Sequence, residues 1–321
     1  MNFDLSDDER ALQQGIRDVC KRLFPMERVR ALEAKPGGLD RALWRELGDA
    51  GVFALRLPEP DGVGLGMTQA VLVFEELGRA IVPGPLVSAH LAAAMVAGGA
   101  NGEQIVGMTE RGRAPRLVGH LPALDALILV DRDGLWNVDP ATVRGTPVER
   151  PLDPLTPMHL VEGLPRGERI AGPEALDRWR LEGAALIAAM SVGIASACVE
   201  QAIAYAKERK QFGRLIGSFQ AVKHSCADML VRAEVARASV YAAGVMLDDP
   251  SSGDAARQVA GARLLASEAA IANGKANIQV HGGMGYTWEV DAHLYLKRAM
   301  VLATRFGRAD ELAESIARTL A

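Results

Sequence analysis

Aromatic residues and cysteines are both scarce in this sequence of 321 residues. Phe, Trp and Tyr together account for only 5% of it, while alanine is abundant, and this composition favours close-packed helices over β-sandwiches. The three cysteines, Cys20, Cys198 and Cys226, are odd in number and far apart, which indicates neither a disulfide framework nor a zinc site. We expect them to be buried or free thiols.

Signals for export, membrane insertion and nucleic-acid binding are also missing. The segment from Met1 to Arg10 is acidic and has no apolar core of the kind found in signal peptides. The most apolar stretch, residues 86–99, is about 14 residues long, which is too short to span a bilayer. Acidic and basic residues are well mixed around a formal charge of −4, so no nucleic-acid partner is expected. These absences predict a cytoplasmic protein without a membrane partner.

The first third of the chain carries a series of helix signals. Ser6 and Glu9 have the spacing of a capping box, and apolar residues follow at helical intervals. Asp40 is expected to cap a second helix and Thr68 a third. A fourth helix is expected at residues 85–96. These signals predict an N-terminal helical domain.

The texture changes at about residue 102, where prolines and glycines become frequent and β-prone runs appear. Residues 126–130 and 135–138 flank Asp131-Arg132-Asp133-Gly134, which is a hairpin signal. We therefore expect a small β-rich middle domain.

After Pro173 the helical pattern returns and predicts a four-helix bundle. The expected helices are residues 176–210, 219–247, 254–277 and 293–321, the last with a break near Gly307. The sequence thus predicts a mainly α fold in three parts. They are an N-terminal helical domain (1–101), a reduced β-rich middle domain (102–173) and a C-terminal four-helix bundle (174–321).

A basic, glycine-bearing segment follows the first helix of this bundle. It reads Glu208-Arg209-Lys210-Gln211-Phe212-Gly213 and continues as Gly217-Ser218-Phe219-Gln220. Arg209 can form a charge-assisted pair with a phosphate, Phe212 can pack on a planar ring, and Gln220 can hydrogen-bond a ribose or an adenine. The alternative is a helix end whose cations suit the helix dipole.

A second segment reads Gln279-Val280-His281-Gly282-Gly283-Met284-Gly285. Three glycines in four positions let a backbone approach a ligand closely and expose its N–H groups. No strand precedes them and the spacing is not that of a Rossmann or P-loop fingerprint. A plain helix–helix loop is the alternative.

In this order and spacing the two segments resemble the acyl-CoA dehydrogenase family. The first is similar to the family's R-x-x-F-G…Q motif and the second to its Q-x-x-G-G-x-G motif. Phe74-Glu75-Glu76-Leu77-Gly78 and Thr287-Trp288-Glu289 also follow the family pattern, so the resemblance covers the chain from its helical start to its helical end.

The resemblance implies FAD as cofactor and an acyl-CoA thioester as substrate. In the family a glutamate base takes the substrate's α-proton, the β-hydride goes to flavin N5, and electrons pass to electron-transferring flavoprotein. The motif residues grip the pyrophosphate and adenosine of FAD, typically from the neighbouring subunit. Carried over position by position, the implied FAD-binding residues are Arg209, Gln211, Phe212, Gln220, Gln279, Gly282 and Gly283.

Two departures from the family pattern concern the active site itself. Gly107-Met108-Thr109-Glu110-Arg111-Gly112 begins like the family's flavin-ring segment, but no Ala-Gly-Ser-Asp follows. Gap-free counting places Phe306 at one usual location of the catalytic glutamate and Gly183 at the other. Glu182 is one residue away, which is about 100° around a helix.

The two departures fit one explanation. Some actinobacterial steroid-degrading members of the family pair a full-length subunit with a short one, and this chain resembles the short subunit in its length and its reduced middle domain. This chain is then expected to complete the FAD site of a full-length partner, in an α2β2 heterotetramer of steroid catabolism and β-oxidation, with the catalytic base in the partner. One alternative is a self-sufficient homotetramer that uses Glu182 as base. Another is a flavin-free helical assembly protein.

Overall fold

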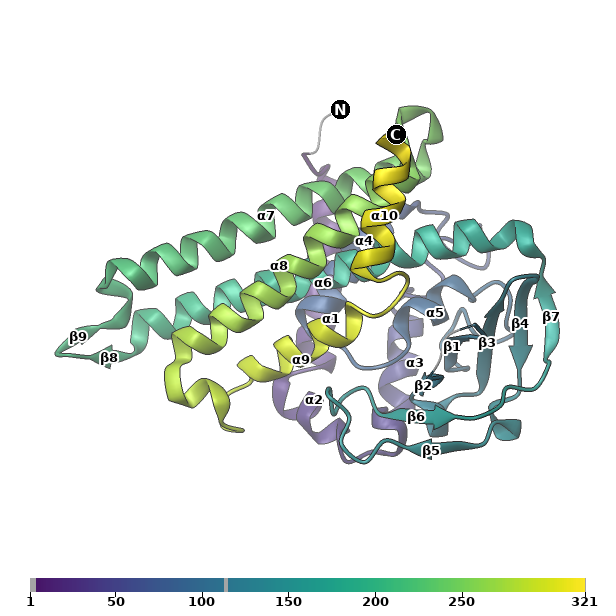
Figure 1. Ribbon diagram of the computed structural model, residues 1–321, viewed down its shortest axis with the longest axis horizontal. Coiled ribbons are helices and arrows are strands. Elements are labelled where there is room, and N and C mark those ends of the chain that lie inside the picture. The colour runs from purple at the N-terminus through teal and green to yellow at the C-terminus, as the bar shows by residue number, and fades with distance from the viewer. Residues whose placement is uncertain (1–3, 113–114, 321) are drawn as a thin grey trace. The chain divides into compact units, whose positions relative to one another are not determined.

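The computed structural model describes residues 4–112 and 115–320, and its elements follow in the order helical, β, helical (Figure 1). These residues fall into two compact units. The bundle unit comprises Met1–Lys21, Met67–Val82 and Ala184–Ala321, and the sheet unit comprises Arg22–Gly66 and Pro83–Gly183. The predicted three-part division with boundaries at 101 and 173 stays a prediction, whereas the mainly α fold is confirmed.

Local capping signals start the first helices as predicted. In the capping box, the backbone N–H of Ser6 donates to Glu9 Oε2 at 2.8 Å, and that of Glu9 donates to Ser6 Oγ at 3.2 Å. Asp40 Oδ1 accepts the N–H of Ala42 at 3.0 Å. The N-terminal helices are α1 (Asp7–Leu23), α2 (Met26–Leu32), α3 (Arg41–Asp49), α4 (Met67–Arg79) and α5 (Leu86–Leu91).

The predicted cap of α4 is wrong. Thr68 lies inside the first turn of this helix instead of before it. The N–H groups of Met67 and Thr68 instead donate to the carboxylate of Asp248, each at 2.7 Å. The fourth helix is also shorter than the predicted 85–96, because Ala92 already has ψ 2° and the chain continues in turns.

The described residues of the sheet unit form two small sheets, with strand orders β1-β3-β4-β7 and β2-β6-β5. The predicted hairpin is confirmed: β3 (Ala126–Asp131) pairs antiparallel with β4 (Gly134–Val138). Gly134 has φ 141°, which glycine adopts more readily than other residues. The other strands are β1 (Val106–Glu110), β2 (Leu117–Gly119), β5 (Gly145–Pro147), β6 (Met158–Val161) and β7 (Glu168–Ala171).

In the described residues after Pro173 there are five α-helices, and the predicted break in the last predicted helix is confirmed. They are α6 (Leu176–Glu208), α7 (Gln220–Asp248), α8 (Ala255–His281), α9 (Ala292–Leu302) and α10 (Ala309–Leu320). Within the bundle unit α4 crosses α6 in backbone contact, since a Cβ on Gly193 would lie 1.9 Å from the carbonyl oxygen of Glu75. Residues Pro173–Glu208 are long and apolar enough to cross a membrane, but their apolar stretch is wholly buried, as in the core helix of a soluble protein.

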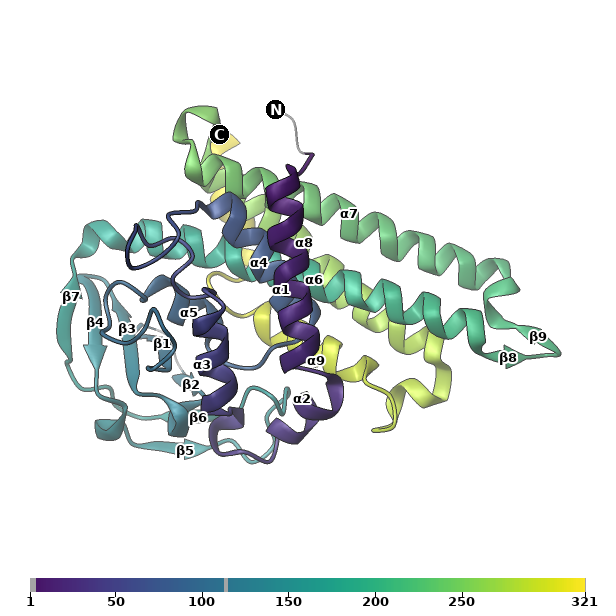
Figure 2. The same ribbon diagram turned by 180° about the vertical axis from the view of Figure 1, so that it is seen from behind.

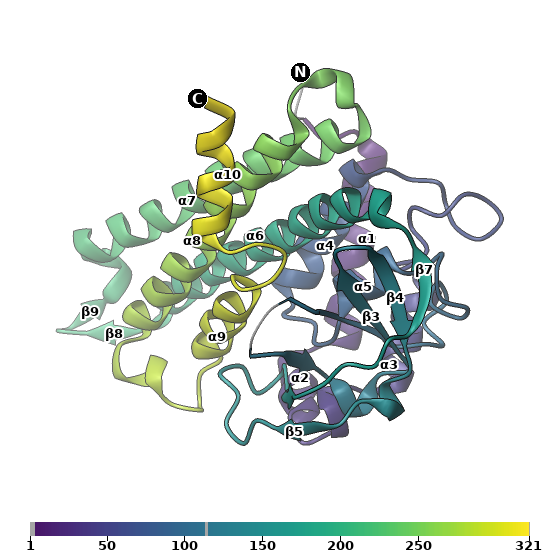
Figure 3. The same ribbon diagram turned by 45° about the vertical axis from the view of Figure 1, so that its right-hand side comes forward.

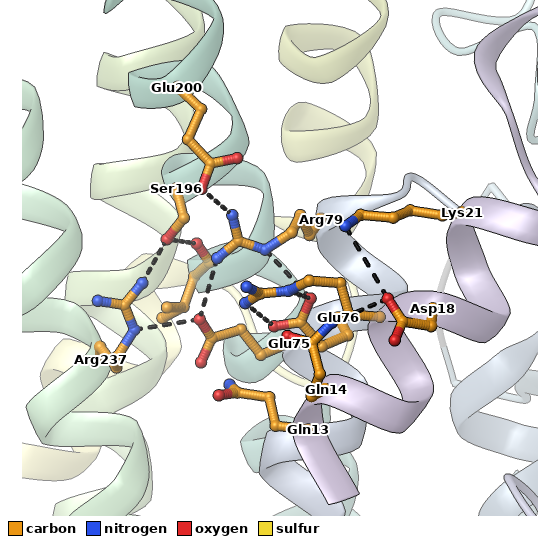
Figure 4. Close-up of polar contacts among 12 residues, drawn as sticks. Gln13, Gln14, Asp18, Lys21, Glu75, Glu76, Arg79, Ser196, Glu200 and Arg237 are labelled. Carbon is orange, nitrogen blue, oxygen red and sulfur yellow. Dashed lines mark hydrogen bonds and ion pairs between the residues drawn. The ribbon is translucent and has the colours of Figure 1, made fainter. Parts of the chain in front are cut away.

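A buried ion cluster ties α1, α6 and α7 to α4 (Figure 4). Glu75 and Glu76 are each 1% exposed. Arg17 forms a bidentate pair with Glu76 at 2.8 Å, and Arg237 Nε donates to Glu75 Oε1 at 3.1 Å. The outer side of α1 is seen in Figure 2. Since a buried charge is costly unless it is paired, these contacts hold α1 firmly in the bundle unit.

Candidate functional site

The two motif segments lie together at one end of the bundle unit (Figure 3). Tyr205, four residues before Arg209, stacks on His281, the last residue of α8, with ring centroids 4.2 Å apart. This stacking joins the end of α6 to the end of α8. The loops that follow these two helices therefore begin side by side.

The first loop is a tight hairpin of β8 (Lys210–Gln211) and β9 (Arg214–Leu215). Its two central residues, Phe212 and Gly213, have φ of 54° and 75°. Positive φ at both positions is the signature of a type I′ turn, for which Asn-Gly is the preferred pair. A bulky residue at such a position is a backbone outlier, and the Phe212 ring is 90% exposed. The ring makes an edge-on contact with Phe219, with ring centroids 6.1 Å apart, but it buries little surface in the fold.

Exposed polar side chains lie around this hairpin. The side chains of Arg209, Gln211 and Gln220 are all exposed, and among the described residues none forms an ion pair with Arg209. Gln220 begins α7, whose preceding residue offers no side-chain cap to the first N–H groups. An exposed arginine beside a helix N-terminus attracts an anion.

The glycines of the second loop are required for different physical reasons. Gly282 has φ 61°, and a Cβ on Gly285 would lie 2.5 Å from the Ile278 carbonyl oxygen. Gly283 has neither constraint, because its φ is not positive and a Cβ at this position would meet no atom within 4 Å. Such an open glycine lets an external group come close to the backbone. Gln279, in the last turn of α8, is exposed beside it.

Two exposed aromatic residues near the second loop were given no role from the sequence. Tyr286 is 78% exposed and Trp288 is 57% exposed, and Lys297 Nζ lies 4.5 Å from the centre of the Trp288 ring. Among the described residues, these two and Phe212 are the exposed large aromatics. The scarcity of aromatics in the composition was the signal that could have drawn attention to them.

The side chain of Glu182, the candidate base, lies in the sheet unit inside an arginine clamp. Arg56 donates to its two carboxylate oxygens at 2.8 and 2.6 Å, and Arg178 Nε donates at 2.7 Å. Burial acts to raise the pKa of Glu182, but the hydrogen bonds and charges of Arg56 and Arg178 outweigh it and hold the pKa below the usual value. A general base works best with a pKa near the operating pH, so this geometry is typical of a structural ion cluster.

Neither position reached by gap-free counting carries a carboxylate. Phe306 is buried with φ 48° at the break between α9 and α10, and Gly183 is buried in α6. The location of the catalytic base in a partner chain stays a prediction.

The three cysteines are free thiols, as predicted. Burial raises the pKa of Cys20 and Cys198 to about 12, so neither is a thiolate near neutral pH. Within residues 4–112 and 115–320, no group of three or more His, Cys, Asp or Glu residues is arranged to hold a metal ion.

The end of the bundle unit thus offers an exposed cation, an exposed ring and an approachable backbone. Such groups can hold a phosphate and a planar ring. They fit the pyrophosphate and adenosine of a dinucleotide such as FAD.

Comparisons with known proteins give the family. Residues 6–105 match the acyl-CoA dehydrogenase N-terminal domain and residues 179–321 the C-terminal domain. The acyl-CoA dehydrogenase IpdE2 of Mycolicibacterium smegmatis is 34% identical over 304 residues, which cover 92% of this chain and 93% of that protein.

Solved structures share the fold over nearly the whole chain. The ChsE4–ChsE5 complex from Mycobacterium tuberculosis has a chain with a TM-score of 0.85 and 23% identity, covering 100% of this chain and 99% of that one. A variant of the Tcur3481–Tcur3483 steroid ACAD gives a TM-score of 0.82 at 24% identity, covering 98% of each chain. Together with the two matched domains and the whole-length relative, this places the chain in the acyl-CoA dehydrogenase family of enzymes.

Proposed function

We propose that this chain is a subunit of a heteromeric FAD-dependent acyl-CoA dehydrogenase, and that it supplies the adenosine and pyrophosphate half of a partner's FAD site. The observation that carries the proposal is Phe212, whose ring is 90% exposed at φ 54°. A strained and exposed phenylalanine is unfavourable for the free chain, and such strain tends to occur at binding sites. Gly283 supports the same proposal, because a Cβ at this position would meet no atom of the chain and its backbone is therefore open to a ligand.

Each residue at the bundle end has a distinct part in this proposal. The planar guanidinium of Arg209 suits two pyrophosphate oxygens, and Phe212 offers a ring face to the adenosine. Gly282 and Gly283 let the backbone come close to the dinucleotide. The side-chain amides of Gln211, Gln220 and Gln279 supply hydrogen bonds to its ribose and adenine. When bound, FAD supplies hydride acceptance during α,β-dehydrogenation of an acyl-CoA.

The catalytic base belongs to the partner in this proposal. Glu182 already accepts three charge-assisted hydrogen bonds from two arginines. Its lowered pKa makes it a poor proton acceptor at neutral pH. The chain then needs a full-length subunit that holds the flavin ring, the acyl-CoA and the base.

The structural neighbours suggest the partner and the substrate class. ChsE4–ChsE5 is a complex of two proteins, and Tcur3481–Tcur3483 is described as a steroid ACAD. We therefore propose an α2β2 assembly with a full-length acyl-CoA dehydrogenase, a steroid-derived acyl-CoA as substrate in β-oxidation, and electron-transferring flavoprotein as acceptor. A cytoplasmic location accompanies this proposal.

The test is FAD titration of the complex formed with a full-length acyl-CoA dehydrogenase, after removal of bound flavin. A charge-assisted hydrogen bond contributes roughly 1.5–3 kcal/mol, so Arg209→Ala should weaken FAD binding about ten- to a hundredfold. Arg209→Lys should recover only part of this, since a point charge cannot bind two oxygens as a fork.

Three outcomes would contradict the proposal. Unchanged FAD affinity of the Arg209→Ala complex would make the segment a charged helix end. A yellow, active homo-oligomer of this chain alone would favour a self-sufficient enzyme. A stable colourless assembly that never takes up flavin with any partner would favour a structural protein.

A further inference from the structure

The ladder of the β8–β9 hairpin sorts its side chains onto two faces. Lys210 lies opposite Leu215, and Gln211 lies opposite Arg214. Directly opposite residues of an antiparallel pair project from the same face, and neighbours along a strand project from opposite faces. Arg214 therefore shares a face with Gln211, whereas Lys210 projects from the other face.

Arg209 belongs to the same face as Arg214. It lies two positions before Gln211, and its carbonyl oxygen accepts the N–H of Ile216 at 2.8 Å, which continues the ladder by one residue pair. The hairpin projects from the end of the bundle unit (Figures 1 and 2). Two guanidinium groups, with the amide of Gln211 between them, are thus offered to a ligand from one side.

Neither arginine is neutralised by the chain. Arg209 and Arg214 are both exposed, and among the described residues no carboxylate forms an ion pair with either of them. The pyrophosphate of FAD consists of two linked phosphate groups, each with a negative charge. One guanidinium binds two oxygens as a fork, so Arg209 alone leaves one phosphate group without a cation. A second arginine on the same face can supply that cation.

The ring of Phe219 restricts the position of the Arg214 guanidinium. Arg214 Cζ lies over this ring, 4.0 Å from its centre, which is a cation–π contact. The contact orders a long side chain but uses none of its N–H donors, and in the described part of the chain no group accepts a hydrogen bond from this guanidinium. Ordering before binding lowers the entropy that a ligand contact costs. Arg214 is therefore prepared for an anion that the chain itself does not provide.

Phe219 also places Arg214 beside other groups of the candidate site. Phe219 directly precedes α7, whose first N–H groups have no side-chain cap, and its ring meets that of Phe212 edge-on. An anion held by Arg214 consequently lies close to a helix N-terminus, where the dipole favours negative charge. We propose that Arg214 is a second phosphate-binding residue of the FAD site and holds the pyrophosphate together with Arg209. This inference rests on the proposed function and adds a residue to it.

The test is FAD titration, at several salt concentrations, of the complex with a full-length acyl-CoA dehydrogenase. Arg214→Ala should weaken FAD binding about tenfold or more, because a charge-assisted hydrogen bond is lost. It should also make the affinity less dependent on salt, since one ionic contact is gone. Arg214→Lys should keep the salt dependence but recover only part of the affinity. Lys210→Ala is the matched control, because it removes one positive charge from the opposite face of the same hairpin, and it should change the affinity by no more than about twofold.

Far-UV circular dichroism and size-exclusion chromatography check that each variant folds and assembles. Equal FAD affinities of the Arg214→Ala and Lys210→Ala complexes would overturn the inference, as would parent-like affinity of Arg214→Lys. Weaker binding with an unchanged salt dependence would overturn it too, because Arg214 would then only support the shape of the hairpin. If Arg209→Ala still weakens FAD binding in any of these cases, the proposed function stands without Arg214. If Arg209→Ala also binds FAD as tightly as the parent, the proposed function fails as well.

Discussion

At the hairpin turn, Phe212 lowers the stability of the fold but is proposed to favour FAD binding. The substitution Phe212→Asn should change these two properties in opposite directions. An L-residue at φ 54° costs about 1–2 kcal/mol, and asparagine tolerates this region better than phenylalanine does. Little burial is lost, because the ring is 90% exposed. We expect the free energy of unfolding to rise by about 0.5–1 kcal/mol, which corresponds to roughly 1–3 °C in Tm.

FAD binding should change in the opposite direction. Stacking of a base on an aromatic side chain contributes roughly 1–3 kcal/mol, so the complex with Phe212→Asn should bind FAD about tenfold or more weakly. Thermal denaturation of the chain and fluorescence titration of the complex measure the two effects. Phe212→Tyr keeps both the ring and the strain and should match the parent in both assays. If the asparagine variant were less stable, or bound FAD as tightly as the parent, the reasoning from backbone strain would fail.

Three further predictions concern other positions. Gly283→Ala should leave Tm unchanged, because a Cβ at this position would meet no atom of the chain, but it should weaken FAD binding by the complex. Gly15→Ala, at an equally open glycine in α1, should leave FAD binding intact. Equal effects of the two substitutions on FAD binding would contradict the prediction. Glu182→Gln should keep most activity per folded complex, whereas loss of a true base would cost at least roughly 10²-fold and would place the active site in this chain. Burial lowers the pKa of His90 to about 4, so its neutral form is favoured in the folded state. The contribution of His90 to the free energy of unfolding should therefore be fully present above a pH of about 6.5 and decrease by about 3 kcal/mol as the pH falls to 4. Urea titrations across this range should show a smaller decrease for His90→Gln. The same pH dependence in both proteins would refute the assignment.

Features set by neighbouring residues could be predicted from the sequence, and features set by distant ones could not. The Ser6–Glu9 capping box and the β3–β4 hairpin depend on contacts within a few residues, and both were predicted correctly. The start of α4 depends on Asp248, about 180 residues further on, and the local signal at Thr68 was misleading. The clamp on Glu182 likewise comes from Arg56, 126 residues earlier.

The candidate site shows the same limit. The two glycine motifs could be found from residue types and spacing, because a loop that receives a ligand needs particular residues in order. Their meeting at one end of the bundle depends on the stacking of Tyr205 on His281, which no local pattern encodes. The positive φ of Phe212 could not be predicted from the sequence either, because Phe-Gly is not a residue pair typical of type I′ turns.

The bond from Asp248 to the first turn of α4 has a consequence for the order of events during synthesis. At roughly 5–20 residues per second, a ribosome needs roughly 10–35 s to pass from Met67 to Asp248. The sheet unit ends at residue 183, so all of it has been synthesised before α7 begins. Until α6 (Leu176–Glu208) and α7 have been made, α1 and α4 lack these helical neighbours, and groups that are buried in the folded chain, such as Leu72, Phe74 and Glu75, are uncovered. We therefore expect nascent chains that stop before Asp248 to be held by chaperones, and release to follow completion of α7.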